Sequence, residues 1–128
     1  MLLVVYAGAR FLARGRSLLV AVAAPAILAT FMLRGFDVKT GKRLWIFHTI
    51  PKHGEFGYDT WEKDSADFTG NTGVWAQISV DEQLGLAYLP VELPTGDYYS
   101  GHHPGNHRFS ESNLAVALKH GKRKGHSH

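Results

Sequence analysis

The run Gly-Phe-Asp-Val-Lys-Thr-Gly-Lys-Arg-Leu-Trp at residues 35–45 most constrains how this chain can fold. Phe36 and Val38 are two residues apart, so a strand places both on one face. Asp37 can cap a tight turn through its carboxylate, and Gly41 readily takes the positive φ that such a turn requires. The run therefore predicts a strand, a tight turn and a second strand that ends in a tryptophan.

Short strand signals continue along the chain, separated by two long segments rich in Gly, Pro, Asp and Thr at 49–73 and 92–112. Loops longer than about 12–15 residues are uncommon unless they are functional. A hairpin followed by a large aromatic residue is typical of a β-propeller blade, and the alternative is a generic surface hairpin. The predicted fold class is therefore all-β. We expect strands at Arg34–Val38, Arg43–His48, Val74–Val80, Leu86–Val91 and Leu114–Leu118.

The length of the chain limits how much of a propeller it can form. The chain has 128 residues, and a blade takes about 40–45 residues. A closed propeller needs about 4–8 blades. Residues 34–118 are therefore expected to form about two blades, which is only part of a propeller.

An uncharged stretch of 17 residues at 17–33 follows Arg10, Arg14 and Arg16. Apolar runs of about 17–25 residues can cross a bilayer as a helix, and a basic segment before a short apolar run is also typical of a secretory signal. We expect an N-terminal apolar helix within residues 1–33 that acts as a signal or membrane anchor. The alternative is that residues 1–33 are not native to the fold, because a start site or reading frame is misassigned.

Several unusual motifs follow one another between residues 35 and 112, among them Gly-Asn-Thr-Gly-Val-Trp-Ala at 70–76 and Ser-Val-Asp-Glu-Gln-Leu-Gly at 79–85. Their order and spacing resemble those of the pyrroloquinoline quinone (PQQ)-dependent dehydrogenases, and within them the quinoprotein glucose dehydrogenases. The Asp-x-x-Thr-Gly-Lys-x-x-Trp pattern at 37–45 resembles the tryptophan-docking motif of that family. The resemblance implies a quinoprotein propeller, with further blade strands before the docking motif.

The resemblance also assigns roles to the three tryptophans. It implies that Trp75 stacks against the flat quinone, where a rigid indole offers a large π-face at small entropic cost. The alternative for Trp75 is packing within the blade. Trp45 is expected to pack between adjacent blades, and Trp61 is expected to pack within its loop.

A divalent cation, usually calcium, is implied next to the quinone, held by hard oxygen ligands. In related enzymes an asparagine ligand lies 18 residues after the stacking tryptophan, and Leu93, which cannot bind metal, stands there in this chain. The neighbouring Glu92 is therefore the candidate metal ligand, with a solvated loop acid as the alternative. The catalytic carboxylate is not identified. Asp97 is the nearest acid, and a turn residue is its simpler interpretation.

The resemblance implies a dehydrogenase that oxidises a CH–OH group of a glucose-like sugar or an alcohol. Electrons would pass to a quinone or a cytochrome, and the remaining propeller blades would be partners. The implied location is the periplasm, or the inner membrane facing the periplasm. The alternatives are a non-catalytic, membrane-anchored β-domain and a gene remnant without activity of its own.

Composition excludes several other functions. The chain has no cysteine, which rules out disulfides and thiolate chemistry. The net charge is +3, but basic residues gather at the two ends and aromatic residues in the acidic middle, which disfavours nucleic-acid binding. The histidines at 102 and 103 lie in a Gly/Pro loop that gives no frame for a transition-metal site. The basic, His-rich tail at 119–128 retains Gly-Lys but lacks the Asp, Thr and Trp of the docking motif, so we expect it to be solvated. A change of reading frame is a second interpretation of this tail.

Overall fold

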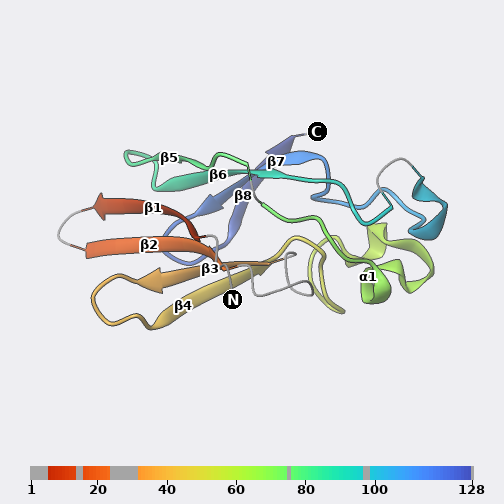
Figure 1. Cartoon of the computed structure of the whole chain (residues 1–128), viewed down its shortest axis with the longest axis horizontal. Helices are drawn as coiled ribbons and strands as arrows, with labels where there is room; N and C mark the ends of the chain where they lie inside the picture. Colours follow the sequence, from red (N-terminus) through yellow and green to blue (C-terminus); the bar gives the residue numbers. More distant parts are fainter. Residues whose placement is uncertain (1–5, 14–15, 24–31, 75, 97–98, 128) are drawn as a thin grey trace, which may run out of the picture.

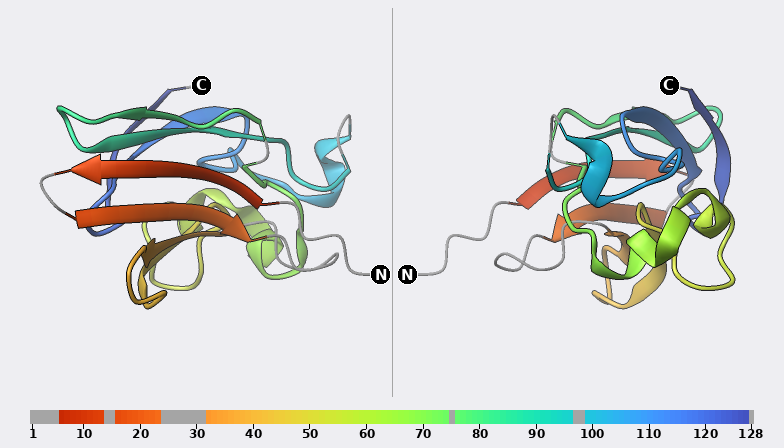
Figure 2. Two further views of the ribbon diagram at one scale, coloured as in Figure 1. Left: turned by 60° about the vertical axis from the view of Figure 1, so that its left-hand side comes forward. Right: turned by 90° about the vertical axis from the view of Figure 1, so that its right-hand side faces the viewer.

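The computed structural model describes residues 6–13, 16–23, 32–74, 76–96 and 99–127, with only the backbone described for residues 6–23. These residues form two four-stranded antiparallel sheets with the orders β1-β2-β3-β4 and β5-β6-β7-β8. Each sheet is a simple meander, and the two sheets lie side by side (Figures 1 and 2). The all-β class predicted from the sequence is confirmed, and the two sheets are consistent with two propeller blades.

The first sheet contains β1 (Tyr6–Ala13), β2 (Arg16–Ala23), β3 (Met32–Asp37) and β4 (Arg43–His48). The second sheet contains β5 (Ser79–Asp81), β6 (Leu86–Val91), β7 (Ser112–Ala117) and β8 (Arg123–Ser127). Short helical turns lie in the connecting loops: η1 (Tyr58–Thr60), η2 (Glu62–Asp64), α1 (Ser65–Phe68) and η3 (Ser100–His102).

The expected N-terminal apolar helix is not observed in the described residues, because β2 occupies much of the apolar stretch. In β2, Leu18 pairs with Asp37 and Ala21 pairs with Arg34. A short apolar run cannot be assigned to helix or strand from its periodicity alone. Here the pairing supplies partners for the backbone of β3, which would otherwise form an exposed sheet edge.

Two other segments also differ from the sequence-based expectation. Of the strand predicted at Val74–Val80, the described residues show only the C-terminal end, as β5 at Ser79–Asp81. The tail expected to be solvated forms β8, which pairs with β7 from Asn113↔Ser127 to Val116↔Arg123. The strands β4 and β6 have the predicted bounds.

The core lies between the two sheets and follows the period of two expected for strands. In β6, Ala87, Leu89 and Val91 are buried, whereas the residues between them are partly exposed. The ten buried apolar residues of the core come from both sheets, from the loops before β5 and β7, and from the β7–β8 turn. They are Leu33, Trp45, Val74, Ala87, Leu89, Val91, Phe109, Leu114, Val116 and Leu118.

Both long loops lie at the same end of the molecule, opposite the β3–β4 and β5–β6 turns (Figure 1). The right-hand view of Figure 2 looks onto this end, where α1 and η3 face the viewer. Isolated bridges join the loops at Trp61↔Gly105 and Asn71↔Pro94. The two loops therefore form one connected surface above the strands.

Candidate functional site

The segment that leads to Trp75 is held in place by the loop that follows β6. The Gly73 N–H donates to the Glu92 carboxylate at 3.0 Å, and the Glu92 N–H donates to the Gly73 carbonyl at 3.0 Å. The Thr72 N–H donates to the Leu93 carbonyl at 3.0 Å. This pairing fixes the Glu92 carboxylate beside a residue only two positions before Trp75.

The same segment contains strained backbone. Asn71 and Thr72 have φ values of 65° and 55°, in the left-handed region. This conformation is unusual for a β-branched residue and costs about 1–3 kcal/mol. Thr72 is fully buried, and its hydroxyl has no hydrogen-bond partner within the described part of the chain. Strain combined with an unpaired buried hydroxyl is typical of a segment shaped for a ligand.

The sequence-predicted site residues can now be placed. Trp75 and Asp97 lie outside the described residues. Glu92 is partly exposed and bonded as above, while the Leu93 backbone bonds to Thr72. The described residues hold no group of three or more His, Asp or Glu side chains that could bind a metal ion.

Trp45 docks between the two sheets, as its position in the motif predicts. Its Nε1–H donates to the Leu118 carbonyl of the second sheet at 2.8 Å. The indole lies so close to Gly35 and Gly121 that a Cβ at either position would overlap it. Two glycines thus make room for one tryptophan, and this contact joins β4 to the β7–β8 turn.

A buried histidine pair organises the loop before β7, which sequence reasoning missed. His103 Nδ1 lies 3.2 Å from His107 Nε2, and Trp61 packs on His107 with ring centroids 4.8 Å apart. Burial lowers the pKa of His107 and outweighs the backbone contacts with His103 and Pro104 that raise it. The sequence did not predict the His103–His107 contact, because the Gly/Pro composition of the loop suggested no ordered structure. The contact depends on how the loop folds back on Trp61.

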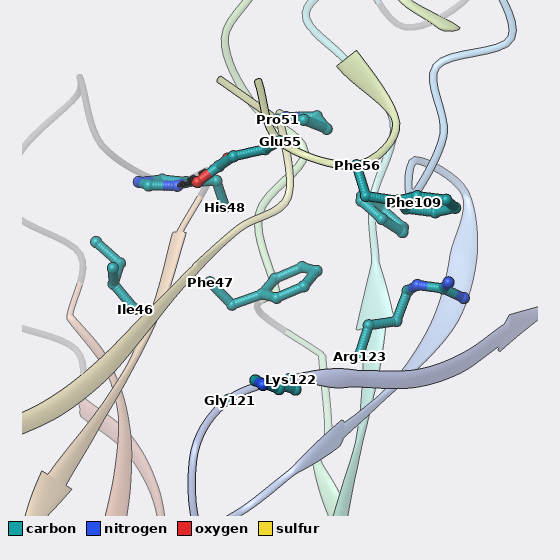
Figure 3. A pocket seen from close by; sticks show the side chains of 10 residues that line it. All are labelled: Ile46, Phe47, His48, Pro51, Glu55, Phe56, Phe109, Gly121, Lys122 and Arg123. Atoms are coloured by element: carbon teal, nitrogen blue, oxygen red, sulfur yellow. Dashed lines mark hydrogen bonds and ion pairs between the residues drawn. The ribbon is translucent and has the colours of Figure 1, made fainter. Parts of the chain in front are cut away.

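An open pocket lies between β4 and β8, the outer strands of the two sheets (Figure 3). We call it the β4–β8 pocket, and its volume is about 270 Å³. None of its described lining residues belongs to 70–74 or 92–95. Its lining residues are Ile46, Phe47, His48, Pro51, Glu55, Phe56, Phe109, Gly121, Lys122 and Arg123.

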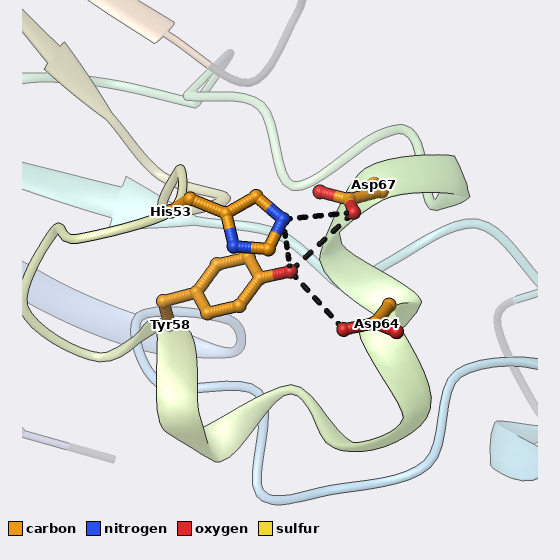
Figure 4. A network of polar contacts seen from close by, with 4 residues as sticks. All are labelled: His53, Tyr58, Asp64 and Asp67. Atoms are coloured by element: carbon orange, nitrogen blue, oxygen red, sulfur yellow. Dashed lines mark hydrogen bonds and ion pairs between the residues drawn. The ribbon is translucent and has the colours of Figure 1, made fainter.

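A polar cluster on the 49–73 loop was also missed, and Figure 4 shows its four side chains. The Tyr58 hydroxyl lies 2.8 Å from His53 Nε2 and 3.4 Å from oxygens of Asp64 and Asp67. Desolvation and the charges of the two carboxylates raise the pKa of Tyr58. The phenol therefore stays protonated at neutral pH and acts as a donor. Only the fold brings these residues together, so no local motif indicates them.

Among the residues with a described structure, no helix is long and apolar enough to cross a bilayer.

Comparison with known proteins adds to the geometry. A family model for the β-propeller domain of glucose/ethanol/alcohol dehydrogenases (PQQ) matches residues 29–127. The chain is 36% identical over 93 residues to quinoprotein glucose dehydrogenase of Escherichia coli (strain K12), covering 71% of this chain and 11% of that protein. It is 31% identical over 93 residues to quinoprotein glucose dehydrogenase A of Acinetobacter calcoaceticus, with the same coverage of 71% and 11%.

A third relative is the glycerol dehydrogenase large subunit of Gluconobacter oxydans (strain 621H), 30% identical over 91 residues, or 70% of this chain and 12% of that protein. The chain thus spans about a tenth of the length of these curated relatives. The family model, the two meander sheets and the docked Trp45 agree with one another. The chain belongs to the PQQ family of glucose/ethanol/alcohol dehydrogenase β-propellers.

Proposed function

We propose that this chain forms two neighbouring blades of a PQQ-dependent dehydrogenase that oxidises a CH–OH group of a sugar or an alcohol. The observation that carries the proposal is the pairing of Gly73 with Glu92. It holds the Glu92 carboxylate against the backbone of Gly73, which lies two positions before Trp75 in the sequence. The quinone supplies the two-electron acceptor for this oxidation. The relatives are named as dehydrogenases of glucose and glycerol, which supports the substrate class.

The residues near Trp75 fit a bound quinone in one respect. The buried Thr72 hydroxyl lacks a partner among the described residues, and a polar ligand beside the loop would provide one. In the proposed site, the Trp75 indole would lie against the flat ring system and fix its orientation. The strained backbone at Asn71 and Thr72 would set the direction from which the chain reaches Trp75.

We further propose that Glu92 is one oxygen ligand of a divalent cation such as calcium. One of its carboxylate oxygens accepts the Gly73 N–H, and the other makes no hydrogen bond in the described part of the chain. A calcium ion takes about 6–8 oxygen ligands. The described residues assemble no group of three candidate ligands, so the other ligands would come from outside them. The catalytic base stays unassigned, with Asp97 as the nearest candidate acid.

The other partners are extensions of the same proposal. Further blades would complete the walls of the site, and a quinone or cytochrome would take the electrons. One relative is named as a hydroxylase linked to cytochrome c, which supports the second acceptor. We propose a location facing the periplasm. In this proposal, β1 and β2 act as blade strands, because β2 pairs with β3 and β1 pairs with β2.

The test titrates PQQ into the 128-residue chain, with and without calcium, and follows tryptophan fluorescence. Saturable quenching is expected, and Trp75→Ala should abolish most of it while Trp61→Phe should retain it. Glu92→Gln should remove the calcium dependence and leave quenching by PQQ alone. A chain that unfolds cooperatively on heating but shows no quenching would contradict the proposal and favour a non-catalytic β-domain. Absence of a cooperative transition would favour the gene remnant.

A further inference from the structure

The β4–β8 pocket has an aromatic wall made by Phe47, Phe56 and Phe109, and Phe109 also belongs to the core. Phe47 and Phe109 meet edge to face with ring centroids 5.4 Å apart, and Phe56 lies 6.2 Å from Phe109. Phe56 is 58% exposed, although a phenyl ring gains about 1.5–3 kcal/mol from full burial. The pocket is therefore an open, apolar surface that a flat ring could cover.

Two guanidinium groups flank this wall. Arg123 Cζ lies 4.4 Å from the centroid of the Phe56 ring, and Arg108 Cζ lies 5.1 Å from it. Within the described part of the chain, neither guanidinium forms an ion pair with a carboxylate. The other polar side-chain contact of Arg123 is with His126 Nδ1 at 3.3 Å. The Arg123 donors are thus mostly available to an anion.

Glu55, the carboxylate that lines the pocket, already has hydrogen-bond partners on the side away from Arg123. Glu55 accepts a hydrogen bond from the Lys52 N–H at 2.8 Å and lies 2.9 Å from His48 Nδ1. Figure 3 shows Glu55 and His48 at the left of the pocket and Arg123 at the right, below Phe56 and Phe109. The pocket is consequently polarised, with its free positive charge at Arg123 and the exposed Lys122 beside it.

We propose that the β4–β8 pocket binds a small aromatic carboxylate. The ring would lie against Phe47, Phe56 and Phe109, and the carboxylate would accept hydrogen bonds from Arg123. A guanidinium matches a carboxylate with two parallel N–H donors, and the bond is stronger because both groups are charged. A volume of about 270 Å³ suits a ligand of one or two rings. The proposal does not depend on PQQ binding, because it is argued only from described residues of the β4–β8 pocket, which include neither Thr72 nor Glu92.

The test titrates the 128-residue chain with 2-naphthoate and, separately, with the uncharged 2-naphthalenemethanol, using calorimetry or NMR shifts. The carboxylate should bind at least about tenfold more tightly than the alcohol. Arg123→Gln should remove this preference while leaving the affinity for the alcohol within about twofold. The matched control is Lys124→Gln, which removes the same charge from the next, exposed residue outside the pocket and should preserve the preference.

A second variant tests the aromatic wall. Phe56→Ala should weaken both ligands to a similar extent, because it removes ring contact and no charge. Equal affinity of the native chain for the two ligands, or no saturable binding of either, would overturn the proposal. So would an equal loss of preference in Lys124→Gln. If Arg123→Gln weakened both ligands alike, Arg123 would shape the pocket rather than bind the anion, and the assignment would be wrong.

Discussion

The β3–β4 turn begins with Asp37, whereas Ala117 stands at the equivalent position of the β7–β8 turn. In the first turn, the Asp37 N–H donates to the Lys42 carbonyl at 2.9 Å and the Gly41 N–H donates to the Asp37 carbonyl at 2.8 Å. The same two bonds start from Ala117 and Gly121, with the same lengths. The two glycines have φ values of 69° and 67°. The backbone and one left-handed glycine are thus enough to define this turn.

The side chains add different amounts to the two turns. The Asp37 carboxylate accepts from the Lys39 N–H at 3.0 Å, the Thr40 N–H at 2.9 Å and the Thr40 hydroxyl at 2.9 Å. Ala117 can accept none of these. In the first turn the Thr40 hydroxyl also accepts the Lys42 N–H at 3.3 Å. In the second turn His120 Nδ1 takes this role and accepts the Lys122 N–H at 3.2 Å. The second turn keeps its shape with fewer bonds to hold it.

The largest difference lies at the end of each hairpin. Trp45 pairs with Gly35 in the first sheet, and Gly125 pairs with Ala115 at the equivalent place in the second. In the first hairpin the indole of Trp45 therefore packs against the neighbouring sheet. In the second hairpin Gly125 has no side chain that could make such a contact. Turn formation and docking between blades are separate functions of one motif, and the second hairpin retains only the first of them.

Trp45→Ala tests the docking function and should have the largest effect. The substitution removes a buried indole and the bond to the Leu118 carbonyl, so the free energy of unfolding should fall by about 3–5 kcal/mol. Urea unfolding followed by circular dichroism measures it. Leu44→Ala, at a neighbour that is 49% exposed, is the control and should cost less than about 1 kcal/mol. Similar losses in the two variants would show that the indole does not join the sheets.

The paired variants Gly121→Ala and Gly41→Ala should separate turn strain from docking. Both place an L-residue at a positive φ, which costs about 1–2 kcal/mol. At Gly41 nothing lies within 4 Å of the added Cβ, whereas at Gly121 the Cβ would lie 2.5 Å from the Trp45 ring. Gly121→Ala should therefore cost about 1–3 kcal/mol more, because the indole must move. Equal unfolding free energies for the two variants would contradict the docking geometry.

The comparison also shows what the sequence could and could not predict. The pattern around Asp37 and Gly41 predicted β4, because turn chemistry and alternation are local signals. The docking of Trp45 was implied by the resemblance of the motif to the family and does not follow from the local pattern. The motif at 117–125 lacks these side chains, so β8 went unrecognised although its backbone turn is the same. The strand β2 was mistaken for a helix because a 17-residue apolar run fits both structures.

The candidate site was less predictable than the strands. Glu92 was identified from its distance to Trp75 along the chain. That spacing did not predict the hydrogen bond between Glu92 and Gly73, which joins residues 19 positions apart. The His103–His107 pair arises in the same way from a loop that folds back on Trp61. Such contacts depend on how two long loops pack against each other, and no local pattern encodes that packing.

The smallest expected effect is a difference in acid sensitivity between the two turns. Hydrogen bonds from the Thr40 backbone N–H and hydroxyl lower the pKa of Asp37, so the folded turn favours the carboxylate. In acid the unfolded chain therefore binds more protons than the folded chain. The stabilisation by Asp37 is complete above the ordinary pKa of its carboxyl group, near 3.8. It is lost as the pH falls through the lower pKa of the folded state. The equivalent Ala117 has no proton to bind. Amide exchange, corrected for intrinsic rates, should therefore show Gly41 losing protection between about pH 5 and pH 2.5 relative to Gly121, and Asp37→Asn should abolish that divergence. Parallel loss at both glycines would mean that acid acts on the whole chain and that the carboxylate does not distinguish the turns.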